Sequence, residues 1–149
     1  MRFVYIFDID GTIANIEHRL PLITGENKDW DLFYQMMYND KPICDVVQTL
    51  RRLKNTGADI IFITGRPDKY MKETEEWLRR YTEISKPMLI MRKNGDHRED
   101  YIVKKELYEK FIKPFFTIHT LGVFEDRKQC VDMWRSLGLT CYQVADGNY

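Results

Sequence analysis

Apolar residues gather in short runs along the chain, and mixed polar and apolar stretches with helical spacing fill the intervals between them. The runs span residues 3–7, 60–63, 88–91, 121–124 and 141–144. A short, nearly unbroken apolar run is typical of a strand that is covered on both faces. We therefore predict a strand at each of these positions.

The intervals carry amphipathic helical patterns at 44–55, 69–81, 103–111 and 129–137. Gly57 and Gly138 stand where the C-terminal caps of two of these helices are expected. Strands that alternate with helices of this length form βαβ units. The predicted fold class is therefore α/β, with a central parallel sheet and helices on both of its faces.

One segment, 15–40, interrupts this alternation. It is rich in polar and aromatic residues, and Trp30, Phe33 and Tyr34 indicate a short helix within it. Because it follows the first strand directly, we expect it to form a small helical cap over the end of the sheet. Since the 149 residues suit one hydrophobic core, we expect a single domain, 1–149.

Composition narrows the possible functions. Hydrophobic residues make up 44% and charged residues 31% of the chain, and the formal net charge is zero. A net charge of zero argues against electrostatic binding along duplex nucleic acid. It still permits a local positive pocket for one phosphorylated strand end. Cys44, Cys130 and Cys141 form no CxxC pair, and we expect them to be small buried side chains in a reducing cytoplasm. We find no signal peptide and no membrane-spanning run, so no membrane partner is expected.

Chemistry-bearing residues follow the predicted strands directly. They are Asp8 and Asp10 after the first strand, Thr64 and Arg66 after the second, Glu125 and Asp126 after the fourth, and Lys104 and Lys105 in a helix between them. Ligands of an open parallel sheet bind outside the carboxyl ends of the strands. We therefore expect these side chains to meet at one edge of the sheet.

Several carboxylates held together need a cation, and oxygen ligands beside a phosphate indicate Mg²⁺. In such a site Asp8 attacks phosphorus, while Asp10 protonates the leaving oxygen and then activates water. Thr64 and a lysine hold the remaining phosphoryl oxygens. The simpler alternative is that residues 8–11 form an ordinary turn, since Asp and Gly favour turns.

These motifs resemble, in order and spacing, the four motifs of the haloacid dehalogenase (HAD) superfamily. They are DIDGT at 8–12, ITGR at 63–66, the lysine at 104, and FEDR at 124–127. The resemblance implies a Rossmann-like three-layer α/β/α fold, Mg²⁺ bound by Asp8, Asp10, Asp126 and Glu125, and a phosphate intermediate on Asp8.

A closer resemblance covers nearly the whole chain and is to the phosphatase domain of phage-type polynucleotide kinase/3′-phosphatase. It rests on Arg19, the triplet 64–66, VKKE at 103–106, and the stretch 131–147. Segments 16–19 and 28–31 are similar to stand-alone phosphatase-like proteins of phage genomes, for which the compartment is the host cytoplasm. The resemblance implies removal of a terminal 3′-phosphate from DNA or RNA. It assigns phosphate binding to Arg19 and Arg66, with Gly65 and Arg127 beside them.

The chain departs from this family in two places. Glu125 stands where an aspartate is usual, which favours Asp126 as the direct metal ligand. No GxxxxGK[ST] loop is present, so no kinase domain and no use of ATP are expected.

Several residues keep a second interpretation. Lys105 is the alternative to Lys104 as the phosphate contact, and Lys104 with Asp100 has the spacing of a surface ion pair. Arg127 has the position of a helix start. The aromatic residues of 15–40 either pack inside the cap or stack on a base, whereas Trp77 and Trp134 are expected to be structural. His18, His97 and His119 lack metal-ligand spacing, and we assign them no catalytic role.

Three functions remain open from the sequence. The first is a 3′-phosphatase acting on polynucleotide ends, and the second is the same chemistry on mononucleotides or other small phosphoesters. The third is a binding protein for phosphorylated ends without catalysis, against which the complete set of carboxylates speaks. The oligomeric state is left open as well.

Overall fold

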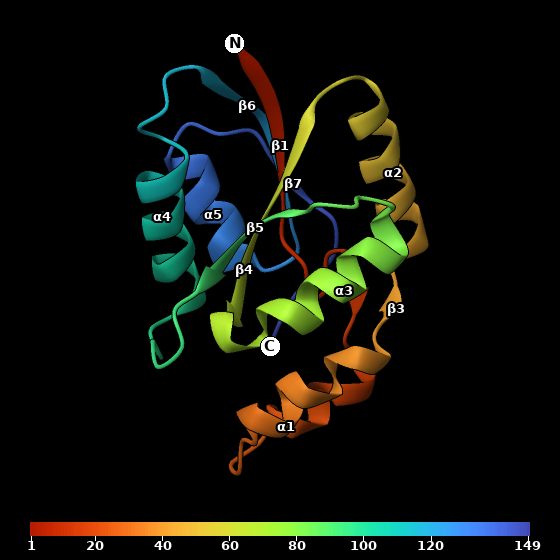
Figure 1. Ribbon diagram of the computed structural model, residues 1–149. Coiled ribbons are helices and arrows are strands. Elements are labelled where there is room, and N and C mark those ends of the chain that lie inside the picture. Colours follow the sequence, from red (N-terminus) through yellow and green to blue (C-terminus); the bar gives the residue numbers. More distant parts are fainter.

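A five-stranded parallel sheet forms the centre of the structure, a computed structural model that describes residues 1–149 (Figure 1). Across the sheet the strands are β5 (Met88–Arg92), β4 (Asp59–Pro67), β1 (Arg2–Phe7), β6 (Ile118–Glu125) and β7 (Cys141–Gln143). Each neighbouring pair is parallel. The first strand in the chain therefore lies in the middle of the sheet.

Two helices cover each face of the sheet (Figure 1). They are α2 (Cys44–Asn55) and α3 (Met71–Thr82) on one face, with α4 (Asp100–Phe111) and α5 (Lys128–Ser136) on the other. Successive side chains of a strand point to opposite faces. In β1, Val4 and Ile6 accordingly pack in the core under α4 and α5, whereas Phe7 packs in the core under α2 and α3. The predicted α/β fold with its parallel sheet is confirmed.

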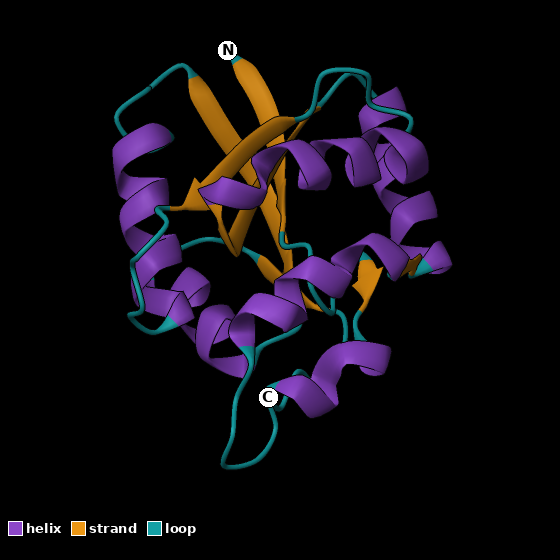
Figure 2. Cartoon of the chain, turned by 60° about the horizontal axis from the view of Figure 1, so that its bottom comes forward, coloured by secondary structure: helices purple, strands orange, loops and turns teal.

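The insert after β1 consists of short elements at the carboxyl end of the strands (Figures 1 and 2). An antiparallel pair, β2 (Ala14–Asn15) with β3 (Lys41–Pro42), forms its base. Between these strands lie the 3₁₀ helix η1 (Glu17–Leu22), the helix α1 (Trp30–Gln35) and the 3₁₀ helix η2 (Met36–Asn39). A small cluster of its own buries Ile16, Ile23 and Phe33. We call residues 15–40 the cap.

Some boundaries differ from the sequence predictions. The helix predicted at 103–111 begins earlier, at Asp100, and β4 runs on to Pro67. The helix predicted at 69–81 is divided into η3 (Asp68–Tyr70) and α3. Gly57 and Gly138 follow α2 and α5 with φ of 93° and 80°, as expected of helix C-terminal caps.

The cysteines follow the prediction in part. Cys130 and Cys141 are buried as expected, but the prediction was wrong for Cys44, which is exposed at the start of α2. No helix of the structure has the length and apolar character needed to cross a membrane.

Candidate active site

Three carboxylates meet at the carboxyl ends of β1 and β6. Asp8, Glu125 and Asp126 each offer an oxygen within 4.8 Å of the others, and all three residues are buried. Neighbouring parallel strands bring them together, because Phe7 of β1 pairs in register with Phe124 of β6. The structure thus places these predicted site residues side by side. We call them the acidic cluster.

Lys104 reaches into the acidic cluster from α4. Its Nζ donates to Asp8 Oδ1 and to Glu125 Oε2, each at 2.8 Å, and lies 3.0 Å from Asp100 Oδ2. Burial alone would lower its pKa, but Asp100, Asp8 and Glu125 outweigh that effect and raise it well above the usual value. Lys105 is exposed, so Lys104 is the lysine that faces the site.

The acidic cluster carries more negative charge than Lys104 offsets. Burial, together with repulsion among the carboxylates, raises the pKa values of Asp8, Glu125 and Asp126 to about 7. Such a site stabilises a cation, and a set of donors made only of oxygen atoms suits a hard ion such as Mg²⁺. The residues present therefore fit the metal that the HAD resemblance implies.

Glu125 and Asp126 differ in how far their oxygens are already engaged. Glu125 accepts from Lys104, from Trp134 Nε1 at 3.4 Å, and from the main-chain N–H groups of residues 126 and 127 at 3.2 and 3.4 Å. Asp126 accepts from Thr12 Oγ1 at 3.3 Å and lies 2.9 Å from the Tyr149 hydroxyl. Asp126 is therefore the freer ligand, which agrees with the direct role expected for it.

Asp10 lies apart from the acidic cluster. Its Oδ1 accepts from Arg19 Nη2 at 2.7 Å and from Arg66 Nε at 3.0 Å. Burial raises the pKa of a carboxyl group, but here the two guanidinium groups outweigh it and hold the pKa of Asp10 well below its usual range. The Asp10 carboxylate is thus not one of the three that meet in the acidic cluster, although the Asp10 main-chain carbonyl accepts from the Tyr149 hydroxyl, which also contacts Asp126.

Arg19 and Arg66 are held by a second carboxylate, Asp40, that the sequence reasoning missed. Asp40 accepts from Arg19 Nε at 2.8 Å, from Arg66 Nη2 at 3.2 Å, and pairs with His18 Nε2 at 2.8 Å. Both arginine side chains are 0% exposed, and neither lines the inner cavity. In the sequence, Asp40 lies in a short polar stretch, 39–41, and belongs to none of the recognised motifs.

The other predicted residues line the pocket itself. Thr64 is buried at its floor and accepts the main-chain N–H of Arg66 at 3.2 Å. Gly65 is packed so closely that a Cβ added to it would lie 2.1 Å from Asp100 Oδ1. Arg127 precedes α5 and donates to the Tyr149 carbonyl at 2.6 Å.

An inner cavity of about 70 Å³ lies over these residues. Its polar lining consists of Asp8, Asp10, Thr64, Tyr34, Arg92, Asp100, Arg127 and Tyr149. Arg92, at the end of β5, was not predicted from sequence, although its place after an apolar run could have indicated it. Its Nε donates to the Gly65 carbonyl at 2.7 Å, and its Nη2 pairs with Asp100 at 3.2 Å.

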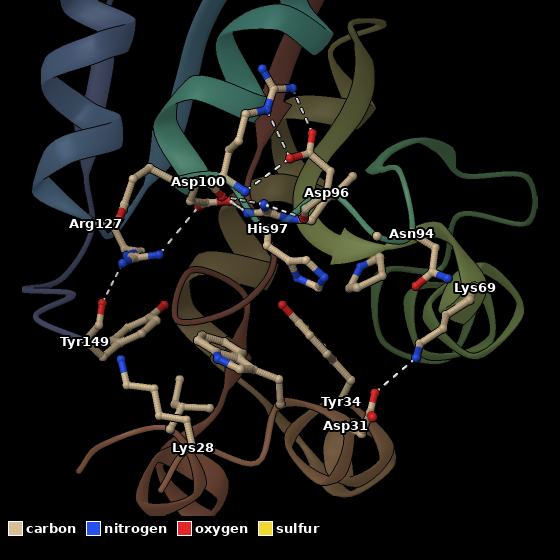
Figure 3. A pocket seen from close by; sticks show the side chains of 17 residues that line it. Lys28, Asp31, Tyr34, Lys69, Asn94, Asp96, His97, Asp100, Arg127 and Tyr149 are labelled. Carbon is tan, nitrogen blue, oxygen red and sulfur yellow. Dashed lines mark hydrogen bonds and ion pairs between the residues drawn. The ribbon is translucent and has the colours of Figure 1, made fainter. Parts of the chain in front are cut away.

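The inner cavity continues into an outer groove of about 360 Å³ (Figure 3). Ile23, Trp30, Tyr34, Arg92, Asp100, Arg127 and Tyr149 line both spaces. One wall of the groove belongs to the cap and the other to the loop 93–99 between β5 and α4. A substrate thus has one path with a small acidic end and a wider aromatic and polar entrance.

Comparisons with known proteins agree with the resemblance predicted from the motifs. A family model described as the phosphatase domain of polynucleotide kinase PNKP matches residues 3–149. A protein of Autographa californica nuclear polyhedrosis virus, named as a bifunctional polynucleotide kinase/RNA ligase, is 30% identical over 131 residues, which is 87% of this chain and 17% of that protein.

Solved structures give the same result. A chain of the Pnkp1/Rnl/Hen1 RNA repair complex matches with a TM-score of 0.84 and 31% identity over 100% of this chain and 44% of that one. A class C acid phosphatase from Bacillus anthracis shares the fold, with a TM-score of 0.71 at 14% identity over 99% of this chain and 68% of its own. The present chain spans less than half the length of the polynucleotide kinase relatives it matches.

Proposed function

Because the chain belongs to the family of HAD-type phosphatase domains of polynucleotide kinase PNKP, we propose that it removes the terminal 3′-phosphate from DNA or RNA strands. The reaction depends on Mg²⁺ and passes through an aspartyl-phosphate on Asp8. The observation that carries this proposal is the buried acidic cluster with Lys104, whose Asp8 lines a small cavity that opens into a groove of about 360 Å³.

In the first step an Asp8 oxygen attacks phosphorus, and the bond between phosphorus and the 3′ oxygen breaks with its electron pair on that oxygen, which takes up a proton from Asp10. Lys104 and Thr64 hold the phosphoryl oxygens, while Arg92 and Arg127 offset negative charge at the cavity wall. Asp8, Asp126 and Glu125 would hold Mg²⁺, which would supply positive charge that lets the anionic nucleophile approach the anionic phosphate.

In the second step a water oxygen attacks the same phosphorus, and the bond from phosphorus to Asp8 breaks, so that inorganic phosphate leaves and Asp8 is restored. Asp10 accepts the proton of the water, a role that suits the ionised state favoured by Arg19 and Arg66. The proton that Asp10 accepts in this step is the one that it gives to the leaving 3′ oxygen in the next turnover, and Arg19 and Arg66 favour that release because they disfavour protonated Asp10. We assign Arg19 and Arg66 to positioning Asp10.

A second substrate class, mononucleotides and other small phosphoesters, is favoured by one observation. The groove volume of about 360 Å³ is in the range of small-molecule sites and lies at the lower end of it. The chemistry at Asp8 is the same for both classes, so comparison of substrates separates them.

The test is phosphate release by the protein, in Mg²⁺ and then in EDTA, from a 3′-phosphorylated oligonucleotide, its 5′-phosphorylated counterpart and a 3′-mononucleotide. We expect release from the 3′-phosphorylated oligonucleotide in Mg²⁺ alone, without ATP, and a loss of at least ~100-fold in Asp8→Asn. Faster release from the mononucleotide supports the second substrate class. An active Asp8→Asn protein, or full activity in EDTA, contradicts the proposed mechanism.

A further inference from the structure

The cap side of the outer groove presents a half-exposed aromatic surface. Trp30 is 45% exposed, and its ring stacks on that of Tyr34 at 6.0 Å with an interplanar angle of 28°. Phe33 supports Trp30 edge-on at 5.6 Å, and Tyr70 of η3 packs on Tyr34 at 5.5 Å. These neighbours fix the orientation of Trp30, which lines the groove rather than the cap core.

Polar side chains of the groove have no partner within the protein. The Tyr34 hydroxyl, the Asn94 amide and the His97 ring form no hydrogen bond with any other group of the chain, although all three residues line the groove. Figure 3 shows the Tyr34 hydroxyl and the His97 ring pointing toward each other across the cavity. Asn94 and His97 are exposed, so these polar groups face the groove and are free to form hydrogen bonds with a ligand that has polar edges.

Most of the cationic side chains that line the groove form ion pairs, but one does not. Lys69, Arg92, Arg98 and Arg127 pair with Asp31, Asp100, Asp96 and Asp100, respectively. Lys28 lines the same groove and has no carboxylate within 4.0 Å. It is therefore the groove cation that remains available to an anionic ligand.

We propose that the outer groove binds the 3′-terminal nucleoside of the substrate, with its base stacked on Trp30. The polar edge of the base faces Tyr34 and His97, and Lys28 meets the phosphodiester that joins this nucleoside to the next one. Aromatic stacking tolerates every base, since each has a π-face. A base stacked on Trp30 is not paired with a second strand, so the groove takes single-stranded or frayed ends.

This inference rests on the proposed function and specifies how that site holds its substrate. The experiment compares two single-stranded 3′-phosphorylated oligonucleotides that differ only in whether the last residue carries a base or is abasic. In the wild-type protein, kcat/KM for the base-bearing end exceeds that for the abasic end by roughly 10-fold, in keeping with the typical strength of base stacking.

Trp30→Ala removes this difference, whereas Trp30→Phe, which keeps an aromatic ring, retains most of it. The loss in Trp30→Ala falls mainly on the base-bearing end and much less on the abasic end, which offers no ring to stack. The matched control is Tyr38→Ala, which removes another exposed aromatic ring of the cap, 56% exposed, that does not line the groove. It leaves the preference for the base-bearing end intact.

A further variant, Lys28→Ala, weakens binding of oligonucleotides but not of a 3′-mononucleotide, which lacks the phosphodiester. Equal kcat/KM for the two ends in the wild type, or an equal loss on all substrates including p-nitrophenyl phosphate in Trp30→Ala, overturns the subsite. No release from any 3′-phosphorylated oligonucleotide, with release from p-nitrophenyl phosphate retained, overturns the proposed polynucleotide substrate instead.

Discussion

Asp10 owes its position and charge to residues that do not touch the cavity. Arg19 and Arg66 hold it, and Asp40 in turn holds both arginines from the far side. Because all three partners are fully or almost fully buried, water does not screen these charges. The network thus fixes an ionised carboxylate in the lining of the inner cavity.

Asp40→Asn tests this arrangement. Loss of one negative charge leaves two buried guanidinium groups with less compensation, which lets them shift and move Asp10. We expect kcat to fall roughly 10- to 100-fold with little change in KM, since Asp40 does not line the cavity. Asp45→Asn, an exposed aspartate nearby in α2, serves as the control and keeps wild-type kcat. Unchanged kcat in a folded Asp40→Asn protein contradicts the positioning role.

At the scale of residues, the sequence predicted which side chains lie close together, but it did not predict all of their ion-pair partners. Asp8, Glu125, Asp126 and Lys104 were placed at one end of the sheet because strand topology fixes where strand ends lie. The partners of Arg19 and Arg66 were not predicted, because an arginine binds a phosphate and a buried carboxylate with the same geometry. Asp40 lies in a polar segment whose fold follows no apolar period, so nothing in its neighbourhood marked it.

At the scale of elements, the last residues of β4 decide how the lining of the inner cavity is built. Gly65 lies against Asp100, which starts α4 and pairs with Lys104 and Arg92. The close approach of β4 to α4 thus depends on the absence of a side chain at residue 65. The structure therefore gives Gly65 a packing role beside the phosphate role that the resemblance implied.

Gly65→Ala is expected to displace Asp100 and with it Lys104, because the new Cβ would lie 2.1 Å from Asp100 Oδ1. Stability should fall by about 1–3 kcal/mol, as is typical of overpacking, and kcat by roughly 10-fold or more. Gly57→Ala provides the comparison, since its φ of 93° strains a side chain in open space at the end of α2. It should lower the unfolding temperature without lowering kcat. A wild-type kcat in Gly65→Ala would contradict this packing role, because it would show that the displacement of Asp100 does not disturb Lys104.

Helices and strands were predicted well where the apolar residues of the sequence pattern are also the buried residues of the structure. In α2, for example, the predicted and observed bounds are the same. The start of α4 was missed because its buried residues are Val103 and the charged Lys104, which break the apolar period. The 3₁₀ helices of the cap were missed because short helices of this kind carry no 3.6-residue pattern.

At the scale of the whole molecule, the acidic cluster couples stability to pH and to metal. The pKa values of Asp8, Glu125 and Asp126 are about 7 in the folded protein, against 3.8 to 4.5 for the free groups. The folded state therefore binds more protons than the unfolded state between about pH 4 and 7, and stability from these groups falls as pH rises through that window. Asp10, whose pKa is lowered, changes the pH dependence of stability only below this pH window.

We therefore expect the unfolding temperature in EDTA to fall between pH 5.5 and pH 8, and Mg²⁺ to raise it at pH 8 by binding the folded state. Asp8→Asn should weaken both effects, since it removes one buried charge and one ligand. Thermal unfolding followed by fluorescence or calorimetry measures these shifts. An unfolding temperature that stays constant or rises with pH in EDTA contradicts the charge balance described here.

The middle position of β1 has a consequence for the order in which the protein is made. The ribosome synthesises Asp8 first, but the neighbours of its strand, β4 and β6, and its donor Lys104 come from much later in the chain. A growing chain of fewer than 104 residues offers Asp8 only the nearby Thr12 as a side-chain partner. Translation thus makes Asp8 before its strand neighbours and its lysine, and a chain interrupted before residue 104 lacks the contact with Lys104 that Asp8 has in the folded protein.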